Sequence, residues 1–183
     1  MIASKHDVNP NDVTMLEFDG EVVDGDNTEY LQLRSYIQQN DLSNDENYNH
    51  VINQIDIDNF MEYNIAQIYM DNRDYPGNNV KYWKVPGGKW RWVLYDTDFG
   101  FAGQWWSDWD QNYAYFFDTL DFVLSGNQTT WANPQWATLF MRKLVQNIGF
   151  RNKFINRYAP VDDHLIVHNE LMTPLILGLS LIH

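Results

Sequence analysis

The chain has 183 residues, of which 44% are hydrophobic and 16% aromatic, so it is not intrinsically disordered and has the length of one ordinary domain. Its 12 Lys and Arg against 25 Asp and Glu give a net charge of −13, which would repel a phosphate backbone and argues against nucleic acid as a partner. Cysteine is absent, which excludes disulfides, zinc–thiolate sites and a cysteine nucleophile. We expect no membrane span and no signal peptide, because apolar runs fall far short of ~20 residues and the N-terminus lacks an apolar segment.

The N-terminal part of the chain is predicted to hold one strand and three helices. Residues 1–26 are acidic and rich in turn formers, so we expect a loop with a short strand near residues 15–18. Apolar residues at helical spacing follow. The predicted helices are residues 28–39 capped by Asn27 or Thr28, residues 45–55, and a third that begins at Asp56 or Asp58 and stops before Asp74.

A hairpin is the clearest prediction of the sequence. Aromatic-rich runs at 80–85 and 89–95 flank a Pro-Gly-Gly turn, which is the pattern of two strands with a short connection. Trp90, Trp92 and Leu94 alternate with Lys89, Arg91 and Val93, so we expect one face of the second strand to be buried. Further helices are predicted near residues 116–124, 136–145 and 150–158.

The residues with the strongest chemical signal flank this hairpin. Arg73-Asp74 comes before it, with Asn79 five residues after the aspartate, and Asp96-Thr97-Asp98-Phe99-Gly100 comes after it. Protein kinases place a catalytic Asp, an Asn and the metal-binding Asp of D-F-G in this order and with this Asp-to-Asn spacing. The order predicts a site for phosphoryl transfer.

Phosphoryl transfer needs these residue types. A carboxylate at Asp74 would orient or deprotonate an acceptor hydroxyl. Mg²⁺ prefers hard oxygen ligands, so Asn79 and one or both of Asp96 and Asp98 would hold the metal against the phosphates of ATP. The same residues also fit ordinary turn chemistry, since Asp and Asn side chains often bond to their own backbone.

Three stretches of the sequence resemble the CotH kinase family, the spore-coat protein H-like atypical protein kinases. They are residues 54–63, residues 74–79 and residues 88–100, and the likeness extends over about residues 26–160. The resemblance implies a bacterial phosphotransferase that uses Mg²⁺ and ATP to phosphorylate Ser or Thr of proteins. Coat proteins are the implied substrates in spore formers, with a location in the spore coat, at the cell surface or outside the cell.

The resemblance also assigns roles to residues. Asp74 matches the catalytic aspartate of the family, Asn79 matches the Asn that follows it, and the YDxD motif falls on residues 95–98. Either Asp96 or Asp98 would then be the main metal ligand. The implied fold is α+β and mostly helical, an atypical protein-kinase-like C-terminal lobe whose central β-hairpin carries the metal-site aspartates.

The sequence departs from the kinase pattern at its N-terminal end. No Gly-rich loop or V-A-I-K motif precedes the first predicted helix, so we expect part of a catalytic domain without its nucleotide-binding lobe. The expected division is an acidic segment over 1–26 as a possible remnant of an upstream lobe, a CotH kinase-like core over 27–160 and a tail over 161–183.

Two other function classes remain open. The first is a carbohydrate- or protein-binding module, or a structural coat-like protein, that uses an aromatic cluster. Its members are Trp105, Trp106, Trp109 and Tyr113. The second is a glycoside hydrolase with Asp96 and Asp98 as its carboxylate pair. His164 and His168 are one helical turn apart with Glu170 nearby, but without the H-E-x-x-H pattern we interpret them as part of a solvated helix face.

Overall fold

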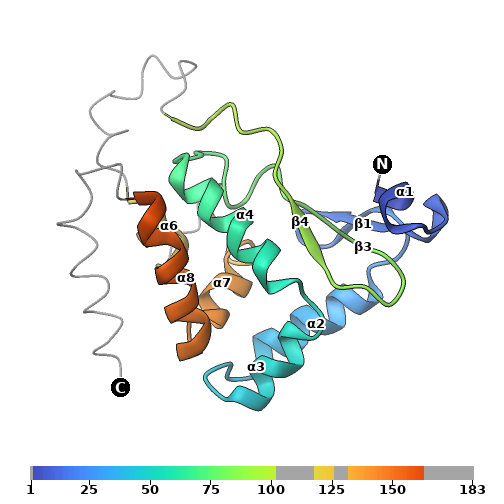
Figure 1. The fold of residues 1–183 in the computed structure, drawn as a ribbon, viewed down its shortest axis with the longest axis horizontal. Helices are drawn as coiled ribbons and strands as arrows, with labels where there is room; N and C mark the ends of the chain where they lie inside the picture. Colours follow the sequence, from blue (N-terminus) through green and yellow to red (C-terminus); the bar gives the residue numbers. More distant parts are fainter. Residues whose placement is uncertain (1, 102–117, 126–131, 163–183) are drawn as a thin grey trace.

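The computed structural model describes residues 2–101, 118–125 and 132–162. A small antiparallel sheet lies at one end of the described chain and a group of helices lies at the other, with a long helix, α4, between them (Figure 1). This mixture of helices and one small sheet confirms the predicted α+β class.

The sheet has four strands in the order β2-β1-β3-β4. Their bounds are β1 Thr14–Glu17, β2 Glu21–Asp24, β3 Lys81–Lys84 and β4 Arg91–Val93. The first strand and the β3–β4 hairpin were predicted, but β2 was not. Gly20 makes the tight β1–β2 turn with φ +97°, a conformation that favours glycine. Because β1 pairs with β2 on one side and β3 on the other, the N-terminal segment is an integral part of the sheet.

Two short helical segments precede the sheet and two longer helices follow its first hairpin. The bounds are α1 Ile2–His6, the 3₁₀ segment η1 Pro10–Asp12, α2 Thr28–Gln39 and α3 Asp45–Ile52. The predicted side-chain cap of α2 was wrong. Asp26 accepts the Thr28 amide at 2.8 Å, whereas Asn27 donates to the Gly20 carbonyl at 2.8 Å. The bond from Asn27 to Gly20 therefore fixes the start of α2 against the β1–β2 turn.

Helix α4, Ile57–Tyr69, begins at the predicted cap and occupies the centre of the fold. Asp56 accepts the Asn59 amide through Oδ1 at 3.1 Å. Most of the helix is buried, including two polar residues. Its buried residues are Phe60, Met61, Tyr63, Asn64, Ile65, Gln67 and Ile68.

The segment leading into α4 closes the outer edge of β4. Asp56 N donates to Trp90 O and Trp90 N donates to Gln54 O, both at 2.9 Å. Asn59 then makes two bonds to the backbone of Trp92, accepting from its N–H at 2.6 Å and donating to its carbonyl at 3.2 Å. Residues 53–56 run alongside β4 and bond to the backbone of Trp90 at its start instead of continuing the helix. This explains why α3 ends before residue 55, the predicted end.

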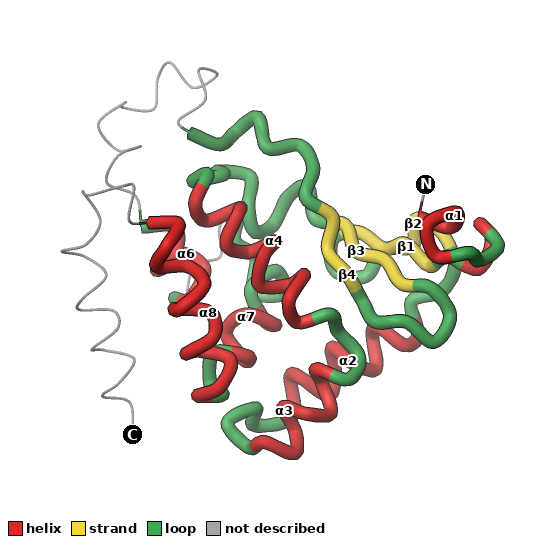
Figure 2. Tube along the Cα trace, viewed as in Figure 1, coloured by secondary structure: helices red, strands yellow, loops and turns green. Residues whose placement is uncertain are grey.

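The remaining helices are α6 Thr119–Leu124, α7 Leu139–Leu144 and α8 Ile148–Asp162. They lie together on the side of α4 away from the sheet (Figure 2). Asn147 separates α7 from α8 and accepts the amides of Gly149 and Phe150 at 2.9 and 3.1 Å, in agreement with the predicted break. None of the helices in the described ranges is long and apolar enough to cross a membrane.

One hydrophobic core joins the sheet to the helices. Trp90 and Trp92 of the second hairpin strand are buried as predicted. Leu94 was predicted to be buried with them but is 47% exposed, because β4 ends at Val93 and the alternation ends with it. The chain leaves the sheet one residue before Tyr95-Asp96.

Candidate active site

Two loops form the candidate site. The first, residues 70–80, follows α4, and the second, residues 94–101, follows β4. Phe101 N donates to Met70 O at 2.5 Å and Arg73 N donates to Phe99 O at 3.4 Å. These backbone bonds bring the two predicted groups of polar residues together.

Asp74 is a nearly buried carboxylate with two amide partners. It is 5% exposed, and Asn78 and Asn79 each donate from Nδ2 to its Oδ2 at 3.0 Å. Burial raises the pKa of Asp74, the Asn78 bond opposes that rise, and the charge of Asp98 adds to it. The structure thus joins Asp74 to the predicted Asn79 through Asn79 Nδ2, and among the described residues no hydrogen bond engages Asn79 Oδ1.

Asp96 and Asp98 lie next to one another on the second loop, and both are exposed. Their mutual hydrogen bond raises the pKa of Asp96, as do partial desolvation and the negative charges of Asp98 and Asp74. The negative charges of Asp74, Asp96 and Asp98 therefore repel one another. Within the described ranges no Lys or Arg forms an ion pair with any of the three.

The backbone is unusual where it presents these side chains. Asn79 and Asp96 have φ values of +53° and +50°, in the left-handed region that Asn and Asp enter more readily than other non-glycine residues. Such conformations cost free energy and are found at functional sites. The peptide bond between Tyr75 and Pro76 is cis.

The oxygen donors of this site suit a hard cation. Two adjacent carboxylates and one amide oxygen are ligands that Mg²⁺ accepts, and uncompensated negative charge favours a cation in their midst. Among the described residues no group of three His, Cys, Asp or Glu side chains is arranged around one metal position. The remaining ligands of a bound Mg²⁺ would be waters and phosphate oxygens, as is usual for this ion.

Gly77 fixes the first loop against a distant segment. Its N–H donates to Ala132 O at 2.7 Å, and a Cβ at this position would lie 2.4 Å from Pro134 Cδ. Glycine is required here because two segments of the chain meet closely.

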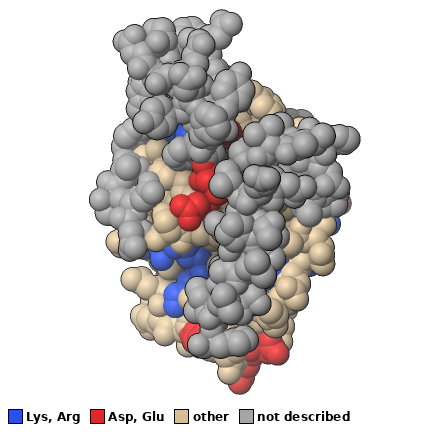
Figure 3. All heavy atoms as spheres, turned by 90° about the vertical axis from the view of Figure 1, so that its left-hand side faces the viewer, with Lys and Arg blue, Asp and Glu red and all other residues tan. Residues whose placement is uncertain are grey.

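A second link ties the first loop to α6. Arg73 forms an ion pair with Asp71 at 2.9 Å, and the Thr119 hydroxyl donates to Asp71 Oδ1. Figure 3 views the molecule from the side where α6 and α8 lie, and acidic and basic side chains form separate groups on that face. Asp71 and Thr119 were not singled out from the sequence, since their contact spans distant parts of the chain.

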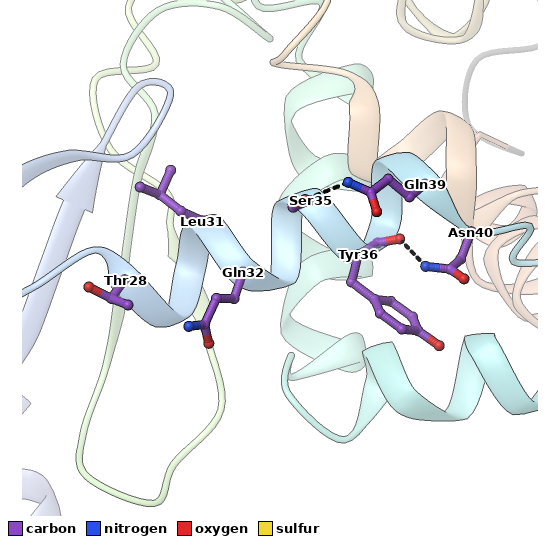
Figure 4. Close-up of a pocket in the computed structure, with 7 residues that line it drawn as sticks. All are labelled: Thr28, Leu31, Gln32, Ser35, Tyr36, Gln39 and Asn40. Atoms are coloured by element: carbon purple, nitrogen blue, oxygen red, sulfur yellow. Dashed lines mark hydrogen bonds between the residues drawn. The ribbon is translucent and has the colours of Figure 1, made fainter.

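A shallow hollow runs along α2, away from the two loops (Figure 4). Gln39 donates to Ser35 Oγ at 2.9 Å, Asn40 donates to the Tyr36 carbonyl at 2.8 Å and the Tyr36 hydroxyl donates to Asn47 Oδ1 of α3 at 2.9 Å, so several of its polar groups already have protein partners. Its lining residues are Thr28, Leu31, Gln32, Ser35, Tyr36, Gln39 and Asn40. The hollow has no carboxylate or cation, and we do not assign chemistry to it.

Two sets of predicted residues lie outside the described part of the chain. They are the aromatic cluster Trp105, Trp106, Trp109 and Tyr113, and the pair His164 and His168.

The family model described as CotH kinase protein matches residues 3–174. The chain belongs to the CotH kinase family. The match covers most of the chain and confirms the resemblance drawn from the three stretches that include Asp74, Asn79, Asp96 and Asp98. Membership indicates a kinase-like function and suggests association with the spore coat. No curated protein and no solved structure matches the chain.

Proposed function

We propose that this CotH family chain catalyses Mg²⁺-dependent transfer of the γ-phosphoryl group of ATP to a Ser or Thr hydroxyl of a protein. The observation that carries this proposal is the meeting of Asp74, Asp96 and Asp98 at two bonded loops, with no described Lys or Arg paired to them. Coat or cell-surface proteins are the proposed substrates.

Asp74 is the proposed base. Asn78 and Asn79 hold its Oδ2, which leaves Oδ1 to accept the proton of the acceptor hydroxyl. As the hydroxyl oxygen bonds to the γ-phosphorus, the bond to the leaving ADP oxygen breaks and the hydroxyl proton passes to the carboxylate. A raised pKa makes Asp74 a better proton acceptor than an exposed aspartate.

Asp96, Asp98 and the Oδ1 of Asn79 are the proposed ligands for Mg²⁺. The metal, when bound, would neutralise phosphate charge and align the γ-phosphoryl group. The two aspartates would bind it as a pair, because bringing a cation between them removes their repulsion. The left-handed backbone at Asn79 and Asp96 would set the direction of two of these ligands.

Calorimetric titration with ATP, in the presence and absence of Mg²⁺, tests nucleotide binding. We expect Mg²⁺-dependent binding that is lost when Asp96→Ala and Asp98→Ala are combined. The double variant Asp7→Ala with Asp12→Ala removes two described carboxylates in the N-terminal segment, outside the site, and should bind as the wild type does. Metal-independent binding, or binding that survives the loss of both aspartates, would contradict the assigned ligands.

Phosphoryl transfer is tested separately with the variant Asp74→Asn. The amide cannot accept the proton, so transfer from labelled ATP to the chain itself or to an added protein should fall by about 10²–10⁴-fold. Mg²⁺-ATP affinity should remain close to that of the wild type. Equal transfer by the wild type and by Asp74→Asn would refute the assignment of the base.

A further inference from the structure

Two buried amides connect α4 to Asp74. Gln67, in the last turns of α4, is 0% exposed, and Asn72, in the loop after it, is 1% exposed. Asn72 Nδ2 donates to Gln67 Oε1 at 2.8 Å, and the Asp74 amide donates to Asn72 Oδ1 at 3.2 Å. A chain of hydrogen bonds thus leads from the helix to the backbone of the proposed base.

The backbone and the side-chain amide of Asn72 both form hydrogen bonds, and these fix its position. Its N–H donates to Gln67 O at 3.1 Å and its carbonyl accepts Tyr75 N–H at 3.2 Å. The side-chain orientation follows from the chemistry, because only Oδ1 can accept the Asp74 amide and Nδ2 must then face an acceptor. Gln67 Oε1 is that acceptor.

Gln67 is an unfavourable residue for stability alone. Its Nε2 is buried without a hydrogen-bond partner among the described residues, and an unsatisfied buried donor costs free energy. An apolar side chain of the same length would remove this unsatisfied donor, but it would also remove the acceptor of Asn72 Nδ2. The side-chain bond from Gln67 to the loop is the one to Asn72, which indicates that Gln67 holds the loop.

We propose that Gln67 and Asn72 are positioning residues, which set the direction in which the main chain presents the Asp74 carboxylate. The inference rests on the proposed function for its catalytic part and on the hydrogen-bond chain for its structural part. Neither residue touches the reacting atoms, so their loss should change the rate of transfer and leave nucleotide binding intact.

Gln67→Met tests the structural part without reference to activity. Methionine fills a similar volume and removes the acceptor of Asn72. By NMR-detected hydrogen exchange, the Asp74 amide should exchange about tenfold or more faster, while the Phe60 amide, bonded to Asp56 O within the first turn of α4, keeps its rate. Unchanged exchange at Asp74 would overturn the positioning role whether or not the protein is a kinase.

Steady-state kinetics test the catalytic part. Gln67→Met should lower kcat about 10–100-fold, since small displacements of a catalytic group have effects of this size, with KM for Mg²⁺-ATP changed by no more than about twofold. Gln67→Glu keeps an oxygen at the Oε1 position and should recover most of kcat. A wild type that transfers phosphate while Gln67→Met keeps full kcat would refute the inference and leave the proposed function standing.

Met61→Ala is the matched control for stability. Met61 is fully buried on the same helix and has no hydrogen bond to the loop. This variant should lower Tm at least as much as Gln67→Met does while keeping kcat close to that of the wild type. An equal loss of kcat in both variants would mean that lower stability, and not the direction of Asp74, accounts for the effect, and would overturn the inference.

Discussion

Asp74 shows how much of a functional site depends on neighbours that a motif does not name. The spacing of Asp74 and Asn79 was predicted and the structure places them in contact. Asn78 makes an equivalent bond to the same oxygen, but a run of two asparagines gives no sign of which one faces the aspartate. Gln67 and Asn72 were missed because a buried amide, on a helix or in the loop after it, has no sequence signature of its own.

Asn78→Ala should reduce kcat for phosphoryl transfer by about tenfold. The variant removes one of the two donors to Asp74 Oδ2, and a bond to a charged group of this kind contributes roughly 1.5–3 kcal/mol. Initial-rate measurements at saturating Mg²⁺-ATP check the value. Asn53→Ala, at an exposed position after α3, is the control, and an unchanged kcat for Asn78→Ala would show that Asn79 alone suffices.

Gly77→Ala should lower the free energy of unfolding by about 1–3 kcal/mol, the usual cost of forcing extra volume into a packed site. The new methyl carbon would overlap Pro134 Cδ, 2.4 Å away, and Ala132 O, 2.8 Å away. Urea denaturation measures the change. Gly149→Ala in the first turn of α8, whose Cβ would meet Asn147 Oδ1 at 3.1 Å and no backbone atom of another segment within 4 Å, should cost less than Gly77→Ala, and an equal cost for the two variants would mean that the two segments at Gly77 separate easily.

Among the elements, α4 connects the sheet, the helices and the site. Its amphipathic stripe was visible in the sequence, because apolar residues recur at helical spacing. Its polar contacts were not, because Asn59 meets Trp92 across 33 residues of chain. The strand β2 was missed for a different reason. All four of its residues are exposed, so no alternation of apolar and polar residues marks it.

Asn59→Leu should destabilise the fold by about 1–3 kcal/mol, since it leaves the N–H and the carbonyl of Trp92 without their partner. Thermal unfolding followed by circular dichroism gives the change in Tm. Asn59→Asp keeps an acceptor for the Trp92 N–H and should have a Tm between those of Asn59→Leu and the wild type. A Tm for Asn59→Leu equal to that of the wild type would rule out a stabilising role for this contact.

The ion pairs of Asp58 with Lys153 and Arg157 join the start of α4 to α8. They lower the pKa of Asp58, so their contribution is present above its unfolded pKa of about 3.9 and is lost as the pH falls through the lower folded value. Asp58→Asn should lose less than about 1 kcal/mol at pH 7, because exposed pairs contribute little. A difference between the two proteins that persists at pH 2 would contradict this origin.

At the scale of the whole molecule, the α+β class and the order of the main helices and the hairpin followed from local patterns. Long-range pairing did not. The sequence gives no sign that β1 lies between β2 and β3, since that choice depends on contacts between residues 14–17 and 81–84. The same limit applies to the site, where the order of motifs was visible and the contact of the two loops was not.

The net charge of −13 predicts that screening stabilises the protein. Raising NaCl from about 10 to 300 mM shortens the Debye length from about 30 Å to less than 8 Å, so repulsion among carboxylates weakens and Tm should rise. MgCl₂ at equal ionic strength should raise Tm further, and this surplus should vanish when Asp96 and Asp98 are both changed to alanine. A fall in Tm with NaCl would show that the surface ion pairs outweigh the overall repulsion.

The bonds that hold α4 to the sheet also limit how copies of this protein could assemble. On the outer side of β4, the backbone groups of Trp90 and Trp92 are already used by residues 54–59, whereas β2, at the other end of the strand order, has β1 as its one strand partner within residues 2–101, 118–125 and 132–162. Among the described residues, β2 is therefore the edge of this sheet that offers its backbone to a foreign strand. Repeated strand addition needs two open edges per molecule, so with its β4 edge closed the described sheet favours association in pairs through β2 over growth into a fibre.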